Sequence, residues 1–358
     1  MLKFIQNSIQ QSAFSIAMDY KQSGVDIDAG NEVVRRIRSL ARGTFTSGVL
    51  SEIGSFGGLF RLGDAGGDDP VLVASADGVG TKLRVAFMTG VHTSIGIDLV
   101  NHCVNDILVQ GAQPLFFLDY LATGRLDPDV AVQIVEGLAA ACRTNGCALL
   151  GGETAEMPGF YADGEYDVAG FIVGVVPRTH VIDGRTIGPG DVLIGLPSSG
   201  LHTNGYSLAR RIAFEIAGLK AAAVVTDLGR PIGEALLTPH RSYLPLIRPL
   251  LGEGLIKGMA HVTGGGITDN LPRMLPAGTH ARIDRSTWQP PPIFRWLQQT
   301  GGVPDSDMLR TFNMGIGLII ACAPDRERAL IDALAAAGEA AAVRIGDIRQ
   351  GGEGVVYV

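Results

Sequence analysis

The sequence predicts an α/β protein of two domains, and three observations lead to this prediction. The chain has 358 residues, a length typical of about two domains. Predicted strands and helices alternate in two series along it. Its 49 glycines, roughly twice the usual ~7% share, gather in short turns between apolar runs. We place the boundary near 177–190, which gives an N-terminal extension over 1–19 and domains over 20–178 and 179–358.

The first series follows a polar, glycine-rich stretch, 20–68, that holds one helix candidate, Asn31–Arg42. Apolar runs predict the strands Val71–Ser75, Leu115–Leu121, Cys147–Gly151 and Asp167–Val176. Helical spacing of apolar residues predicts the helices Thr93–Gly111 and Asp127–Asn145. We expect Asp127 to cap the second helix, because Pro128 suits its first turn.

The second series follows a connection rich in glycine and proline, 177–191. Its predicted strands are Val192–Leu196, Gly258–Thr263, His280–Asp284, Met314–Cys322 and Ala342–Ile348. Its predicted helices are Asn204–Gly218, Thr238–Leu251, Ile267–Leu275, Pro291–Gln299 and Asp325–Ala337. Strands that alternate with helices in this way indicate a second α/β domain.

Composition excludes several classes of function. The net charge is −7 and the chain has no dense run of Lys and Arg, so we expect no nucleic-acid partner. No apolar run approaches the roughly 20 residues that cross a bilayer, so we expect no membrane partner. The four cysteines lack Cys-x-x-Cys spacing and lie among apolar residues, which indicates buried thiols in a reducing cytoplasm. The phosphate-loop and dinucleotide-binding glycine motifs are both absent.

One glycine-rich turn, 75–82, directly follows a predicted strand. Gly78 and Gly80 let backbone N–H groups approach a ligand. Asp77 can hold a hard cation, which prefers oxygen ligands, and Lys82 can offset phosphate charge. The alternative is an ordinary Asp-Gly turn with a solvated lysine.

The predicted helix Thr93–Gly111 has an unusual polar side. At about 100° per residue, one face carries Asp98, Asn101, His102, Asn105 and Asp106. A solvated face usually carries Lys, Glu and Arg, whereas asparagine is a poor helix former. The residues favour a ligand or metal surface and a solvated face about equally.

Three further turns carry polar groups. Glu153 follows a buried-type strand, where α/β proteins place their sites, and a capping role is the alternative. His202 and Asn204 join a strand to a helix, and Asn204 is also a candidate N-cap. Residues 261–270 set three glycines before a helix, a place that favours an anion, with a flexible loop as the alternative. The polar stretch 20–31 suits a mobile lid or a disordered tail equally.

Taken together, these segments resemble the phosphoribosylformylglycinamidine cyclo-ligase family, the aminoimidazole ribonucleotide synthetases. Eight blocks of the sequence match this family in its order: YKQSGVDIDAG, ADGVGTK, GIDLVNHCVNDILVQGAQPLFFLDY, GGETAEMPG, YDVAGF, SSGLHTNGYSL, HVTGGG and RTFNMGIG. Any one block is weakly specific, but eight in order are very specific. The resemblance runs from Tyr20 to about Ile348.

The resemblance implies a two-domain α/β (α+β) fold in which N-terminal sheets pair into the barrel-like core of a homodimer. It implies a cytoplasmic enzyme of purine biosynthesis that uses ATP and Mg²⁺. The substrate would be formylglycinamidine ribonucleotide, and the products aminoimidazole ribonucleotide, ADP and phosphate. ATP would phosphorylate the formamide oxygen, because an amide oxygen leaves poorly and a phosphoryl ester leaves well.

The resemblance also implies roles for the residues that match the family's blocks. As magnesium ligands we expect Asp77, Asp98, Asn101 and Asn105, with Glu153 as a further candidate. Beside the nucleotide we expect Lys21, Asp26, Asp28, Gly78, Gly80, Thr81 and Lys82. At the ribonucleotide we expect Glu153, Thr263, Gly264 and Gly265. As catalytic groups we expect Lys82, His202, Asn204 and His261.

Two departures from the family's sequence pattern and two alternative functions stay open. The stretch 1–19 is longer than the family's usual lead, and Ala76 stands where the family commonly has Thr. A sibling ATP-dependent small-molecule kinase would share the acidic turns but not the GGETAEMPG and SSGLHTNGYS blocks. A non-catalytic nucleotide-binding scaffold would be expected to lose Asp77, Lys82 or Asp98, and all three are present.

Overall fold

The computed structural model describes residues 27–50, 60–63, 67 and 69–358. Lys21, Asp26 and the predicted extension 1–19 lie outside the described residues. Asp28 lies in the helix α1 (Ile27–Arg42), but its side chain is outside the description.

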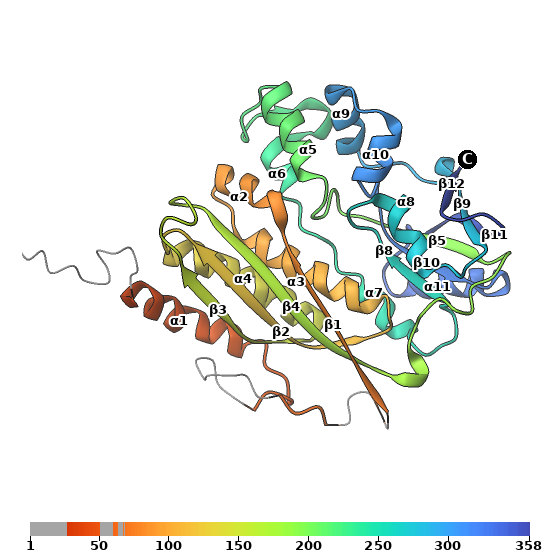
Figure 1. Cartoon of the computed structure of the whole chain (residues 1–358), viewed down its shortest axis with the longest axis horizontal. Coiled ribbons are helices and arrows are strands. Elements are labelled where there is room, and N and C mark those ends of the chain that lie inside the picture. Colours follow the sequence, from red (N-terminus) through yellow and green to blue (C-terminus); the bar gives the residue numbers. More distant parts are fainter. Residues whose placement is uncertain (1–26, 51–59, 64–66, 68) are drawn as a thin grey trace, which may run out of the picture.

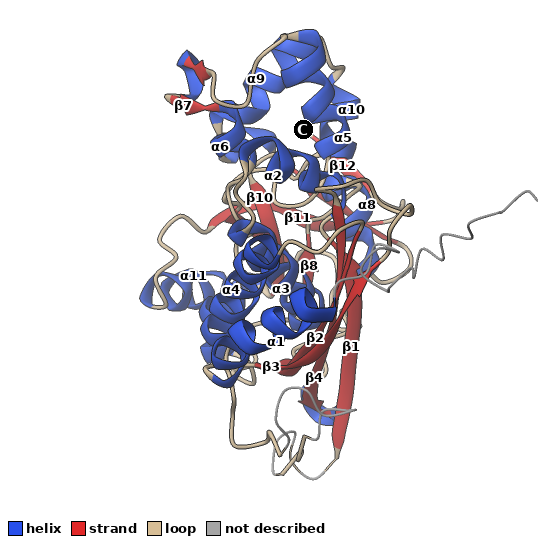
Figure 2. Ribbon diagram, turned by 90° about the vertical axis from the view of Figure 1, so that its left-hand side faces the viewer, coloured by secondary structure: helices blue, strands red, loops and turns tan. Residues whose placement is uncertain are grey.

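The first lobe is a four-stranded sheet with helices on one face. Its strand order is β1-β4-β2-β3, and only the pair β2 and β3 is parallel. The strands are β1 (Pro70–Gly78), β2 (Gln113–Thr123), β3 (Ala148–Glu156) and β4 (Tyr166–Pro177). Figures 1 and 2 show α1, α3 (Thr93–Leu108) and α4 (Pro128–Asn145) on the same side of this sheet. A short 3₁₀ turn (Gly80–Lys82) and α2 (Leu83–Thr89) follow β1.

The second lobe is built on a six-stranded sheet of order β12-β9-β11-β5-β10-β8. Its strands are β5 (Val192–Pro197), β8 (Gly258–His261), β9 (Thr279–Ile283), β10 (Ile316–Cys322), β11 (Val343–Gln350) and β12 (Val355–Tyr357). Its α-helices are α5 (Tyr206–Arg210), α6 (Ile232–Leu236), α7 (Leu244–Ile247), α8 (Gly266–Asn270), α9 (Pro292–Gly301), α10 (Asp305–Thr311) and α11 (Glu327–Ala336). A π-helical turn (Arg211–Ile216) extends α5, and β6 (Val224–Val225) pairs with β7 (Arg230–Pro231). The mixed helix-and-sheet fold is the predicted class, whereas the exact domain bounds stay a prediction.

The strongest local signals are confirmed. The side chain of Asp127 caps α4 by accepting from the N–H groups of Asp129 and Val130, and Pro128 is the first residue of this helix.

Asn204 is not a helix N-cap, because Gly205, in the left-handed region, precedes α5. The helix predicted over Thr238–Leu251 is wrong. Residues 238–243 are irregular because their backbone groups bond to side chains of the first lobe, and only α7 and a 3₁₀ turn (Arg248–Leu250) are helical.

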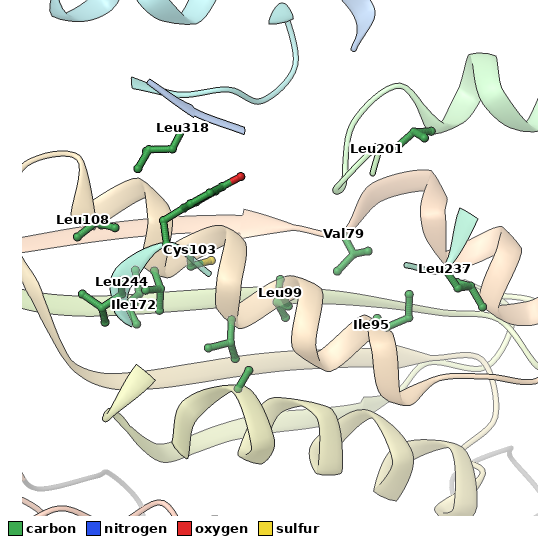
Figure 3. Close-up of a cluster of buried hydrophobic side chains, with 14 of the residues drawn as sticks. Val79, Ile95, Leu99, Cys103, Leu108, Ile172, Leu201, Leu237, Leu244 and Leu318 are labelled. Carbon is green, nitrogen blue, oxygen red and sulfur yellow. The ribbon is translucent and has the colours of Figure 1, made fainter. Parts of the chain in front are cut away.

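The helix α3 is the most deeply enclosed element of the first lobe. Its apolar side packs on the sheet and α4, and one cluster of buried side chains continues into the second lobe. Figure 3 shows Leu99, Cys103 and Leu108 of α3 in that cluster, with Leu244 and Leu318 of the second lobe. A helix buried on all sides needs partners for its polar groups as well.

The crossing of α3 and α4 depends on two glycines. A Cβ on Gly96 would stand 2.1 Å from the carbonyl oxygen of Ile134, and one on Gly137 would stand 2.0 Å from that of Thr93. Both neighbours are backbone atoms, so neither can move aside without shifting a helix. The glycines therefore let the two helix backbones touch and fix the position of α3.

Among the described residues, no helix is long and apolar enough to cross a membrane. All four cysteines are buried and free.

We expect Gly96→Ala to lower the free energy of unfolding by ~1–3 kcal/mol, because the added methyl overpacks the helix crossing. Chemical denaturation with a helix-sensitive signal measures this loss. Gly188→Ala is the matched control, since a Cβ there meets nothing within 4 Å. Equal stability of the two variants would contradict the proposed contact.

Candidate functional site

The polar face of α3 binds a backbone segment of the second lobe, residues 238–243. Asp98 accepts a hydrogen bond from the N–H of His240 at 2.6 Å, and Asn101 donates to the carbonyl of His240 at 2.7 Å. Asn105 accepts from the N–H of Tyr243 at 3.0 Å and donates to the carbonyl of Arg241 at 2.8 Å. These three predicted magnesium ligands therefore already have protein partners, and their metal role stays a prediction.

Lys82 and Asp98 form a fully buried ion pair between the lobes. The Lys82 Nζ lies 2.7 Å from Asp98 Oδ2, and both side chains are 0% exposed. The same Nζ donates to the carbonyls of His202 at 3.2 Å and Thr238 at 2.9 Å. Burial raises the pKa of Asp98 to about 6 although Lys82 opposes the shift, and burial lowers the pKa of Lys82. Lys82 thus holds two loops of the second lobe in place; its predicted contacts with nucleotide stay a prediction.

A cluster of four histidines lies beside this pair. It comprises His102 of α3, His202 and His240 from loops, and His261 at the end of β8, and each is less than 10% exposed. The Nε2 atoms of His240 and His261 are 3.0 Å apart. His202 and His240 stack with ring centroids 4.0 Å apart.

Two carboxylates and a threonine connect the histidines. His102 contacts Asp77 Oδ2 through Nε2 at 2.7 Å and Thr203 Oγ1 through Nδ1 at 2.7 Å. The Thr203 hydroxyl lies 3.3 Å from His240 Nδ1. His261 donates from Nδ1 to Asp106 Oδ1 at 2.8 Å. An unbroken series of polar contacts therefore runs from Asp77 on β1 to Asp106 on α3.

Charges in this cluster shift several pKa values. Burial would raise the pKa of Asp77 and lower that of His102, but their contact outweighs both effects together with further groups, the Gly78 N–H at Asp77 and the Asp106 carboxylate near His102 among them. The pKa of Asp77 therefore lies below its usual range, and that of His102 lies above it. Burial lowers the pKa of His202, His240 and His261, so these three rings favour the neutral form.

A cavity of about 600 Å³ opens beside the cluster, between the lobes. Asp106 and His261 line one part of it, and Thr263, Asn270 and Arg273 line another. Arg273 is the cation among the residues that line this cavity. A pocket of this size, with titratable groups at its wall, is the default place to expect a small ligand.

Several predicted residues meet where the two lobes touch, and Thr263 among them lines the cavity. Asn270 donates to the carbonyl of Gly264, which fixes the glycine loop beside Thr263 and Gly265. Because α8 has only five residues, the glycine loop rather than a long helix shapes the backbone next to Thr263. Asn204 stands against the same loop, since a Cβ on Gly264 would lie 3.1 Å from its Oδ1. Thr81 contacts Ser207 across the lobes at 3.1 Å, next to Gly80 and Gly78 at the end of β1.

Glu153 lies apart from these groups. In the sheet, Asp77 pairs with Gly170, Gly170 with Asp119 and Asp119 with Gly152, so this row faces α3. Glu153 is the next residue along β3, and successive residues of a strand face opposite sides. It therefore faces away from Asp77, and its predicted roles stay predictions. Ala76 likewise faces away from α3.

Sequence reasoning missed two groups of the site. His240 belongs to no glycine-rich turn, and it lies in a segment that the sequence wrongly predicts to be a helix. His102 and Asp106 were recognised on the polar face of α3 but received no role. The spacing of His102 and Asp106, four residues apart on one helix face, was the signal available for them.

Comparison with known proteins defines first the class and then the family. The chain matches the model of the AIR synthase related protein N-terminal domain over residues 57–176 and that of the C-terminal domain over 188–358. Thiamine-monophosphate kinase from Stenotrophomonas maltophilia K279a has the same fold, with TM-score 0.66, 21% identity and coverage of 91% of this chain and 95% of that one. Hydrogenase maturation protein HypE in complex with ATP gives TM-score 0.63 at 20% identity, with 90% of each chain covered.

More similar relatives share one name. A phosphoribosylformylglycinamidine cyclo-ligase from Trichlorobacter lovleyi is 54% identical over 330 residues, covering 92% of this chain and 94% of that protein. A chloroplastic phosphoribosylformylglycinamidine cyclo-ligase from Arabidopsis thaliana is 50% identical, covering 95% and 83%. The chain belongs to the phosphoribosylformylglycinamidine cyclo-ligase family, which is a family of ligases.

Proposed function

We propose that the chain closes the imidazole ring of purine biosynthesis, converting formylglycinamidine ribonucleotide and ATP to aminoimidazole ribonucleotide, ADP and phosphate. The observation that carries this proposal is the high identity to cyclo-ligases over nearly the whole chain. The geometry supports it, because the turn after β1, the loop 202–204 and the loop 263–265 meet between the lobes: Lys82 bonds to the carbonyl of His202, and Asn204 stands against Gly264.

Groups in the cavity wall and in the loops beside it serve each part of the proposed reaction. His261 donates its Nδ1 proton to Asp106, which leaves Nε2 as the basic nitrogen for a proton from the ring-forming amine. His202 and Asn204 stand by the transferring phosphoryl group. Thr263, Gly264 and Gly265 hold the ribonucleotide phosphate, and we add Arg273 as its cation.

A magnesium ion fits part of the predicted donor set. Asp77 is anionic and its side chain is 45% exposed, so its oxygens can serve a hard cation. Mg²⁺ supplies charge neutralisation at the phosphates when bound. Ligation by Asp98, Asn101 or Asn105 would require their contacts with Lys82 and residues 240–243 to open. We also keep the cytoplasmic location in the proposal, which the four free, buried cysteines support.

The reaction is tested by incubating the protein with Mg-ATP and formylglycinamidine ribonucleotide and quantifying ADP and aminoimidazole ribonucleotide. We expect equal amounts of both. Asp77→Asn should lower turnover at least ~100-fold without unfolding the chain, because it removes charge stabilisation beside the phosphates. Asp163→Asn, at an exposed carboxylate, is the control. ADP release without the imidazole product would favour the sibling kinase, and neither product would favour a scaffold.

We propose further that the first-lobe sheets of two chains pair in a homodimer. The face of the sheet opposite the helices carries apolar side chains, among them Leu72 at 60% exposure and Phe171 at 45%. Their neighbours across the strands are apolar as well, since Leu72 pairs with Val175 and Phe171 pairs with Leu118. An apolar sheet face of this kind suits burial against a second copy.

Light scattering of the purified chain tests the dimer. We expect a dimer for the wild type and a monomer for Leu72→Lys combined with Phe171→Lys, because two buried charges would oppose association. Val356→Lys replaces a comparably exposed apolar residue on the other sheet and should stay dimeric. A monomeric wild type, or a dimer that survives both changes, would refute this interface.

A further inference from the structure

Three of the four histidines bring ring nitrogens into a small buried volume. One ligand atom from each of His202, His240 and His261 lies within 4.8 Å of those of the other two. Their exposed fractions are 1%, 1% and 6%. The magnesium proposal leaves these nitrogens unused, since magnesium takes oxygen ligands.

Each ring is held through one nitrogen by a neighbouring group. His261 bonds to Asp106 through Nδ1, and His240 contacts Thr203 through Nδ1. His202 differs, because its Nε2 accepts from the N–H of Ser199 at 3.2 Å and the proton of the neutral ring therefore lies on Nδ1. A partner on the far nitrogen, a carboxylate above all, is the usual way in which proteins orient a metal-binding histidine.

The second nitrogens of His240 and His261 point toward each other within the cluster. The Nε2 atoms of His240 and His261 face each other at 3.0 Å. His202 Nδ1 is buried and has no hydrogen-bond partner. An unpartnered buried nitrogen costs free energy, which a metal would recover once the proton of His202 moves from Nδ1 to Nε2.

We propose that His202, His240 and His261 form a binding site for a first-row divalent transition metal, with Zn²⁺ as its representative. Imidazole nitrogen suits this class of ion, and the site is distinct from any site for magnesium.

Several adjustments accompany binding. The proton of His202 must move from Nδ1 to Nε2, and the bond from Ser199 is lost. Zinc–nitrogen bonds of roughly 2.0–2.1 Å in tetrahedral geometry require the two facing Nε2 atoms to separate by a few tenths of an ångström. His202 must also turn out of its stack on His240, and Asn105 must release His240 Nε2, to which it donates at 3.2 Å. Asn105 keeps its bonds to Arg241 and Tyr243 in doing so.

The test is a titration of the metal-free full chain, purified without a polyhistidine tag, with Co²⁺ as the probe. We expect one Co²⁺ per chain, the strong visible absorption of tetrahedral cobalt, and displacement by Zn²⁺ but not by Mg²⁺. His240→Ala should weaken binding at least tenfold, and Asp106→Asn should weaken it about ten- to hundredfold through His261. His180→Ala, at an exposed histidine, should leave binding unchanged.

Absence of the cobalt bands, or binding that His240→Ala leaves intact, would overturn the proposal. Should His240→Ala fail to fold, X-ray absorption at the zinc edge of the wild type decides. A shell with three imidazole nitrogens supports the site, and a shell without imidazole refutes it. These measurements need neither ATP nor ribonucleotide, so the metal site can fail while the proposed reaction stands. A metal on His261 Nε2 would instead exclude that nitrogen as the base of the reaction.

Discussion

The buried ion pair between Lys82 and Asp98 is the contact on which the interlobe structure depends. Removing two charges from water is costly, and only close pairing with further hydrogen bonds can offset that cost. Here Lys82 bonds to Asp98 and to two carbonyls, and Asp98 also accepts from the N–H of His240. The pair therefore fixes three segments at once: the end of the turn after β1, the loop at His202, and the segment that begins at Thr238.

The site groups take their positions from these three segments. His202 has a φ of +62°, a conformation that the surrounding contacts must hold, and its carbonyl bonds to Lys82. His240 is held at both its N–H and its carbonyl by Asp98 and Asn101. On the far side, Gly317 leaves the space that His202 and Tyr243 occupy, since a Cβ there would lie 2.1 Å from Tyr243 Oη. The same contacts therefore anchor the backbone and position the imidazole rings.

Local signals were sufficient to predict much of the fold. Proline and aspartate at the start of α4, and the apolar runs of the strands, act over a few residues and were interpreted correctly. Residues 238–243 were not predictable in this way, because their conformation is set by side chains more than 130 positions away in the chain. The polar face of α3 shows a related limit. Asp and Asn in a buried row suit ligand binding and backbone anchoring equally, and only the fold distinguishes the two.

The buried pair is tested most directly by equilibrium unfolding of Asp98→Asn. The account predicts a loss of ~3–5 kcal/mol in the free energy of unfolding, because Lys82 is left buried and unpaired. Asp332→Asn, which breaks the exposed pair with Arg328, should cost less than about 1 kcal/mol. Lys82→Met combined with Asp98→Leu should recover only part of the loss, since no charge stays buried but the His240 N–H and two carbonyls lose these partners. An Asp98→Asn variant within about 1 kcal/mol of the wild type would contradict the account.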